Sequence, residues 1–112
     1  MEREAVIAIY DRLIAQSDGL TRKGKATAYT AINGNMFSFV GPDGVLCIRL
    51  SKDDIDAYGL AHSNAPVIRY NSVMQGYVAI SDALLSSEAE LAGWFAKSME
   101  FARGLKPKPT KK

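Results

Sequence analysis

Apolar residues near the start of the chain are spaced as on one side of a helix. They recur at intervals of three and four, at Val6, Ile9, Tyr10, Leu13 and Ile14. This periodicity predicts a helix over residues 2–17 with one buried face. Gly19 follows, and glycine often ends helices because it adopts positive φ without steric strain. A polar stretch over residues 20–27 then leads to the next element.

Residues 28–50 predict three antiparallel strands joined by two tight turns. The strands cover residues 28–32, 35–40 and 45–50. Asn33-Gly34 is typical of a type I′ turn, because both central residues of that turn need positive φ. Gly41-Pro42-Asp43-Gly44 suits the second turn, since proline fits its second position and Gly44 can take the left-handed conformation.

The middle of the chain predicts a short helix and two further strands. Ser51 can cap the backbone amide of Asp54, and Ile55 and Tyr58 then form an apolar helix face. The two strands, with Asn71-Ser72 as the turn between them, cover residues 67–70 and 74–81.

A final helix is predicted over residues 87–105. Ser87 and Glu90 have the S-x-x-E spacing of a capping box at its start. Helical spacing links Leu91, Trp94, Phe95, Ser98, Phe101, Ala102 and Leu105. Residues 106–112 contain two prolines, four lysines and no apolar residue, which predicts a disordered basic tail.

The predicted order of elements is α-β-β-β-α-β-β-α. The simplest α+β arrangement of these elements is a single, mainly antiparallel, five-stranded sheet with the helices packed on it. A chain of 112 residues has room for one domain, here residues 1–105. Neither a signal-peptide pattern nor a run of about 18 apolar residues is found, so we expect a cytoplasmic protein.

Charge is distributed unevenly along the chain. The formal net charge is +2, but residues 1–102 carry nine basic and twelve acidic residues, a net charge of −3. The basic clusters that could contact nucleic-acid phosphates are Arg22, Lys23 and Lys25 in a loop and Lys106, Lys108, Lys111 and Lys112 in the tail. A nucleic-acid-binding accessory protein is therefore one alternative function. Phe37 and Phe39 are expected on one strand face, as core residues rather than a base-stacking platform.

Few residues carry candidate chemistry. A single cysteine excludes an internal disulfide, and a single histidine excludes any site that needs two. Cys47, Arg49 and His62 are the candidates for a small-ligand pocket, the second alternative function. Residues 19–26 match the phosphate-binding G-x-x-x-x-G-K-[ST] pattern except at Ala26, and they lie between a predicted helix and a strand, the reverse of its usual context. No catalytic, cofactor-binding or metal-binding residue is assigned, and we do not expect an enzyme.

Several stretches together resemble the N-terminal domain of the TfoX/Sxy family. They are residues 32–37 (INGNMF), 43–50 (DGVLCIRL) and 74–80 (MQGYVAI), with the closing helix and tail at 91–94, 101–103 and 107–108. The resemblance spans about residues 28–108. It departs from the family at Gly24 to Thr27, where the family carries an M-F-G-G-like segment, and the chain lacks the second, helical domain of the full competence regulators.

The resemblance implies a regulatory role and no catalytic residues. Named members of the family act with the transcription machinery in the expression of DNA-uptake genes. We therefore expect a non-enzymatic regulatory or protein-interaction module, possessing no cofactor, with an unidentified protein partner and a homodimer as one possible assembly. Fold resemblance supports architecture more firmly than function.

Overall fold

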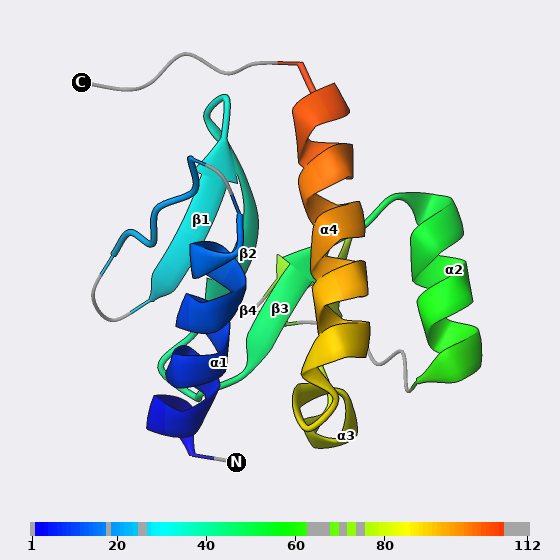
Figure 1. Ribbon diagram of the computed structural model, residues 1–112. Helices are drawn as coiled ribbons and strands as arrows, with labels where there is room; N and C mark the ends of the chain where they lie inside the picture. The colour runs from blue at the N-terminus through cyan, green and yellow to red at the C-terminus, as the bar shows by residue number, and fades with distance from the viewer. Residues whose placement is uncertain are drawn as a thin grey trace.

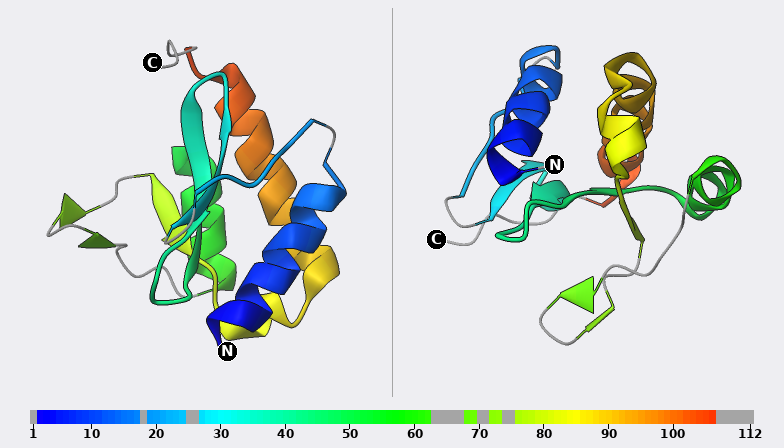
Figure 2. Two further views of the ribbon diagram at one scale, coloured as in Figure 1. Left: turned by 90° about the vertical axis from the view of Figure 1, so that its left-hand side faces the viewer. Right: turned by 90° about the horizontal axis from the view of Figure 1, so that it is seen from below.

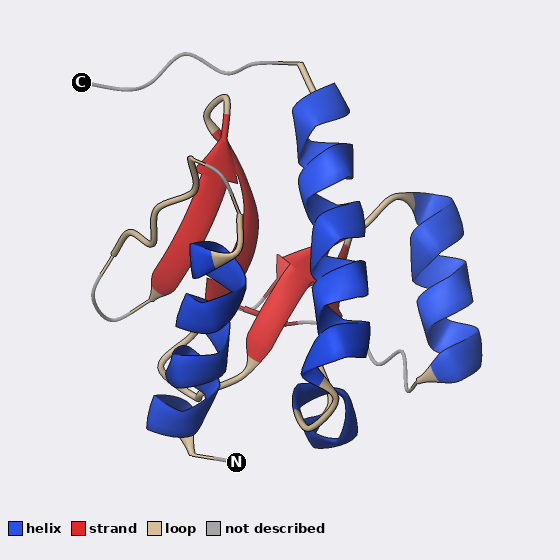
Figure 3. Ribbon diagram, in the orientation of Figure 1, coloured by secondary structure: helices blue, strands red, loops and turns tan. Residues whose placement is uncertain are grey.

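The computed structural model describes residues 2–17, 19–24, 27–62, 68–69, 72–73 and 76–106 (Figures 1 and 3). Its helices are α1 (Arg3–Ala15), α2 (Lys52–Ala61), α3 (Asp82–Leu85) and α4 (Glu88–Gly104). Its strands are β1 (Ala28–Ile32), β2 (Asn35–Val40), β3 (Leu46–Arg49), β4 (Ile68–Arg69), β5 (Ser72–Val73) and β6 (Tyr77–Ala79). The predicted α+β class agrees with this architecture, and α3 is an element that the sequence pattern missed.

The prediction of one five-stranded sheet is wrong. The main sheet has four antiparallel strands in the order β1-β2-β3-β6, and β4 pairs with β5 in a separate two-stranded sheet. Gly76 has φ +86° just before β6, and among the described residues the strand that pairs with β3 is Tyr77–Ala79. The predicted strand over 74–81 ran through Gly76, and the one over 67–70 is described only as β4. Residues 67, 70, 71, 74 and 75 lie outside the described part of the chain.

Two helices cover one face of the main sheet. Figure 2 shows α1 and α4 side by side on that face, α2 beyond the β6 edge, and the β4–β5 pair on the opposite side. All five apolar residues predicted for the buried side of α1 are buried, as expected. Phe95 of α4 lies between α1 and the sheet, because its ring centroid is 6.3 Å from that of Tyr10 and 5.7 Å from that of Phe37.

A β-bulge in β2 places Phe37 under α4. Thr30 pairs with Ser38, but the next residue of β1, Ala31, pairs with Met36, so that Phe37 is the extra residue. Phe37 therefore joins the core beneath the helices, whereas Phe39 belongs to a second cluster with Cys47. The expectation that Phe37 and Phe39 share a face is thus wrong, because the bulge changes the alternation between them.

The Asn33-Gly34 turn forms as predicted, but only one of the two predicted helix caps does. Asn33 and Gly34 both have positive φ, 53° and 80°, as a type I′ turn requires. Ser51 caps α2 by accepting from the amide of Asp54. Ser87 makes no side-chain cap at the start of α4, so the predicted capping box is not formed.

A buried group of hydroxyls joins α1 to the sheet. The Tyr10 hydroxyl lies 2.7 Å from Ser38 Oγ and 3.4 Å from Thr30 Oγ1, and the Ser38 and Thr30 hydroxyls are also hydrogen-bonded to each other. All three side chains are inaccessible to solvent. Burial raises the pKa of Tyr10 to about 12, an increase that the hydrogen bonds to Ser38 and Thr30 partly oppose.

The Tyr10 hydroxyl is expected to make stability fall in alkali. Its folded-state pKa of about 12 exceeds the ordinary value of 10.0, so its contribution is complete below pH 10 and is lost as pH rises towards 12. Two pKa units correspond to roughly 2–3 kcal/mol. Urea unfolding from pH 8 upwards should show this loss in the wild type and a flatter profile in Tyr10→Phe. Parallel profiles for the two proteins would contradict the assignment.

Ser98 fastens α4 to the sheet where β2 and β3 separate. Pairing of these strands ends at Ser38–Ile48, although β2 begins at Asn35 and β3 continues to Arg49. The buried Ser98 hydroxyl lies 3.2 Å from the carbonyl oxygen of Phe37 and 2.5 Å from that of Arg49. A hydroxyl has one proton to donate, so Ser98 serves one carbonyl from each strand in a shared bond.

Removing the Ser98 hydroxyl should destabilise the fold. Ser98→Ala leaves one buried and one partly buried carbonyl oxygen without this donor, which corresponds to a loss of about 1–3 kcal/mol in the free energy of unfolding. Urea denaturation of Ser98→Ala and of Ser87→Ala provides the measurement. Ser87 is an exposed serine of the same region without a cap bond, so its variant should stay within about 0.5 kcal/mol of the wild type. Equal effects of the two substitutions would refute the role of Ser98.

Candidate functional site

The three residues proposed for a small-ligand pocket lie in two places. Cys47 is fully buried with Phe39, on the sheet face turned away from α1 and α4. Arg49 lies two residues further along β3 and is partly buried. His62 ends α2 and faces α4. The contacts that the described residues make with His62 come from α2 and α4, not from β3.

His62 connects α2 to α4 through a hydrogen bond and ring contacts. Its Nε2 lies 2.9 Å from Glu90 Oε2, and its ring lies 4.9 Å from Tyr58 and 6.4 Å from Trp94. The Tyr58 hydroxyl donates to the carbonyl oxygen of Ala79, 2.9 Å away. Ala79 lies on β6 at the end of the strand order, so this bond occupies an edge position of the sheet.

Arg22 and Lys23, two loop residues of the predicted nucleic-acid site, make contacts within the fold. Arg22 Nε lies 2.7 Å from Asp11 Oδ1, so a carboxylate partly neutralises its charge. The backbone of Lys23 exchanges two hydrogen bonds with Tyr29, each 2.9 Å, and extends the sheet beside β1. Lys106 is exposed, and its carbonyl oxygen accepts from Asn35 Nδ2. The other residues of this prediction lie outside the described part of the chain: Lys25, Lys108, Lys111 and Lys112.

The predicted tail over 106–112 is described only at Lys106. Its carbonyl bond to Asn35 holds the end of the described chain beside the β1–β2 turn. The segment from Gly24 to Thr27, at which the sequence departs from the resemblance noted above, is described at its two ends. Gly24 has φ +83°, and a Cβ there would lie 2.1 Å from the carbonyl oxygen of Thr27. Both the positive φ and this close contact favour glycine at position 24.

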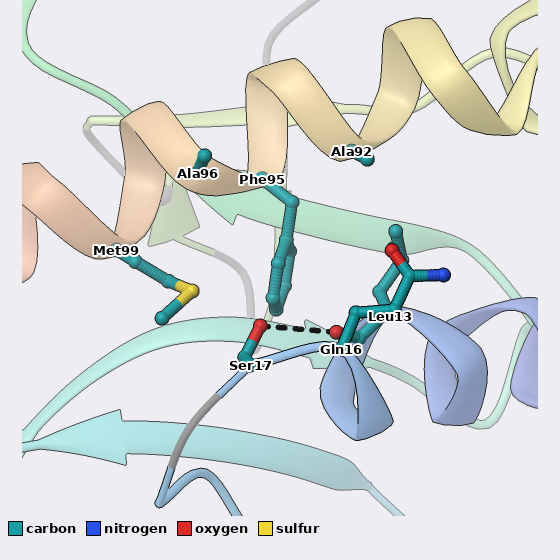
Figure 4. A pocket seen from close by; sticks show the side chains of 7 residues that line it. All are labelled: Leu13, Gln16, Ser17, Ala92, Phe95, Ala96 and Met99. Carbon is teal, nitrogen blue, oxygen red and sulfur yellow. Dashed lines mark hydrogen bonds between the residues drawn. The ribbon is translucent and has the colours of Figure 1, made fainter.

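An apolar groove lies between α1 and α4, and we take it as the candidate site. Figure 4 shows Phe95 and Met99 of α4 pointing towards the end of α1. The groove encloses a cavity of about 140 Å³, lined by Leu13, Gln16, Ser17, Ala92, Phe95, Ala96 and Met99. Leu13, Phe95 and Met99 are buried, while Gln16 and Ala96 are exposed at the rim.

A second hollow adjoins the groove at Met99. Its volume is about 300 Å³, and it is lined by Gly19, Leu20, Ala31, Ile32, Asn33, Met99 and Arg103. It therefore extends the first cavity along α4 towards the β1–β2 turn. The first cavity exposes mainly apolar surface, whereas the second exposes mainly polar surface and carries one guanidinium, that of Arg103, which also pairs with Glu100.

The groove has the chemistry of a binding surface rather than of a reaction centre. No titratable side chain is among the seven residues that line its first cavity. The Ser17 hydroxyl donates to the carbonyl oxygen of Leu13, 3.0 Å away, and so completes the last turn of α1 (Figure 4). An apolar cavity of comparable size, about 150 Å³, can hold a molecule such as benzene. The groove thus has room for one leucine- or phenylalanine-sized side chain.

An exposed ion pair joins the two walls of the groove near one end. Arg12 of α1 and Glu88 of α4 form a bidentate hydrogen-bonded pair one turn before Ala92. The hydrogen bond from Arg12 lowers the pKa of the Glu88 carboxyl below its ordinary value. Both side chains are exposed, so the pair contributes little to the free energy of unfolding.

Sequence reasoning did not find this groove. Its signal is the pair of small residues Ala92 and Ala96, four residues apart and beside Phe95 and Met99 on the same helix. Such spacing marks a shallow strip along a helix. Only the packing of α1 against α4 shows that the strip borders a cavity.

Comparison with known proteins provides no identification. No family model matches the chain, and no curated protein matches it. Among the described residues, no helix has the length and apolar character needed to cross a membrane. The same part of the chain contains no group of three His, Cys, Asp or Glu side chains placed to bind a metal.

Proposed function

We propose that this protein is a non-enzymatic interaction module of the cytoplasm, whose α1–α4 groove receives an apolar side chain of a protein partner. The observation that carries the proposal is the open apolar cavity between the two helices, lined without a titratable group. Its buried floor of Leu13, Phe95 and Met99 offers hydrophobic contact area. Apolar side chains inserted into such pockets are typical anchors of protein interfaces.

The proposed partner presents a short apolar segment. One leucine or phenylalanine would enter the cavity beside Ala92 and Ala96, and the next residues would run along Met99 into the adjoining hollow. Arg103 borders that hollow, which favours a polar or acidic residue at the corresponding position of the partner. A second copy of this chain is one protein that could present such a segment.

A regulatory role in transcription is the biological context that we propose for this interaction. Its support is the resemblance of residues 32–37, 43–50 and 74–80 to the TfoX/Sxy N-terminal domain, whose named members work with the transcription machinery. The groove supplies a surface through which a small module of this kind could contact a larger assembly.

The groove can be tested by filling its rim with a charged side chain. Ala96 is exposed, so Ala96→Arg should leave stability within about 0.5 kcal/mol of the wild type. Its guanidinium would occupy the mouth of the cavity and should reduce partner affinity at least tenfold. Pull-down from native cell extract, followed by titration of the recovered protein, measures this loss. Sedimentation of the same variant shows whether the partner is a second copy.

Ala57→Arg is the matched control, because Ala57 is an exposed helical alanine on α2, outside the groove. It should retain the same partner with unchanged affinity. Equal binding by Ala96→Arg, Ala57→Arg and the wild type would show that the groove is not the interface. If no specific partner is recovered and transcription is normal in a deletion strain, the regulatory proposal fails as well.

A further inference from the structure

Arg49 differs from the other arginines whose side chains the structure describes in how its guanidinium is placed. Arg12, Arg22 and Arg103 each pair with a carboxylate, and Arg3 donates to the carbonyl oxygen of Gly41. Arg49 Nε, by contrast, is a buried nitrogen without a hydrogen-bond partner. Among the side chains that the structure describes, no carboxylate lies within ion-pair distance of this guanidinium.

The surroundings of Arg49 are aromatic rather than acidic. Its guanidinium carbon lies 5.6 Å from the ring centroid of Phe101, within the range of a cation–π contact. Tyr77 is its partner residue across the β3–β6 pair. Burial raises the pKa of Tyr77, and the positive charge of Arg49 opposes that rise. The guanidinium therefore interacts electrostatically with the Tyr77 phenol. The Tyr77 hydroxyl itself donates to the carbonyl oxygen of Met36.

The local backbone keeps this arginine side chain in place. Ser98 bonds the carbonyl oxygen of Arg49, which fixes the end of β3 beneath α4. Gly76 lies against the arginine stem, since a Cβ at that position would be 3.6 Å from Nε and 3.8 Å from Cγ. With φ +86°, residue 76 also favours glycine for conformational reasons. The arginine is therefore held between a ring and a glycine turn.

A partly buried guanidinium without a counter-charge is a feature that needs an explanation. Desolvation of a cation costs free energy that a paired anion or a full set of hydrogen bonds normally offsets. Only Nε is buried and unpartnered; the two Nη nitrogens have neither that burial nor a hydrogen bond from the described residues. They therefore keep some exposure to solvent. Nitrogens in this planar arrangement match the paired oxygens of a carboxylate or phosphate.

We propose that Arg49, backed by Phe101, is a binding site for a small oxyanion, either a carboxylate or a phosphate group. The two Nη nitrogens donate to the oxyanion, while the aromatic ring and the glycine turn restrict the guanidinium to one orientation. The site belongs to the far end of β3 and shares no lining residue with the α1–α4 groove.

The test is a side-chain NMR titration of the full chain at constant ionic strength. Inorganic phosphate and acetate are the two probes, and chloride maintains the ionic strength. We expect a saturable shift of the Arg49 side-chain resonances and of the Phe101 ring, and comparison of the two probes shows which oxyanion is preferred. Arg12, an exposed arginine of α1 paired with Glu88, is the internal control and should not saturate.

Arg49→Lys keeps the charge and removes the planar fork, so it should weaken the preferred oxyanion at least tenfold. Arg12→Lys should leave that affinity unchanged. Parallel, non-saturating shifts at Arg49 and Arg12 would mean an adventitious ion only and would overturn the proposal. An unchanged affinity in Arg49→Lys would do the same. Because the wild-type titration needs no variant, the proposal remains testable even if Arg49→Lys folds poorly.

Discussion

The separation of β2 from β3 beneath α4 is the constraint on which most of this structure depends. The bulge at Phe37 lets the start of β2 diverge from the end of β3, and Ser98 bridges the two carbonyl groups at that point. Phe95, one turn earlier on α4, packs on Phe37 itself. The Ser98 hydroxyl and the Phe95 ring therefore fix the position of α4 on the sheet. The hydroxyl is needed because a bulge leaves backbone carbonyl groups that the strand pairing does not satisfy.

Two surfaces with different chemistry follow from the position of α4. On one side, α4 lies beside α1 without closing against it at Ala92 and Ala96, and the apolar groove remains. On the other, Phe101 reaches the end of β3 and covers the guanidinium of Arg49. The α1 side is fixed independently by the Tyr10 hydroxyl bonded to Ser38 and Thr30. The width of the groove is thus set by contacts beneath it, which leaves its rim free to bind.

Local sequence signals predicted the elements well, whereas pairing between distant strands escaped them. The Asn33-Gly34 turn and the cap at Ser51 depend on residues within a few positions of one another. The strands predicted over 67–70 and 74–81 do not both join the main sheet. Which of them does so depends on which one pairs with the edge of β3. A two-residue strand carries too little pattern to show that choice.

The bulge and the sites were unpredictable for a related reason. Alternation in β2 reads as regular through Phe37 and Phe39, and only the pairing with β1 reveals the extra residue. Glu90 has the right spacing to cap Ser87 but bonds His62, because a tertiary partner competes with the local one. The pocket residues proposed from sequence were selected by chemical type. Of these, Arg49 is distinguished by its contact with the Phe101 ring and by an Nε atom without a hydrogen-bond partner. Both are properties of the fold.

The two candidate surfaces are separable because they use opposite sides of one helix. Successive residues of α4 are about 100° apart, so Ala92, Ala96 and Met99 form one stripe, and Glu90, Trp94 and Phe101 form another roughly opposite. The first stripe borders the groove. The second contacts His62, Tyr58 and Arg49. Between them, the core stripe is Leu91, Phe95, Ser98 and Ala102. Substitutions at the exposed rim of one surface therefore leave the packing of the other in place, and the groove and the arginine can be assigned separately.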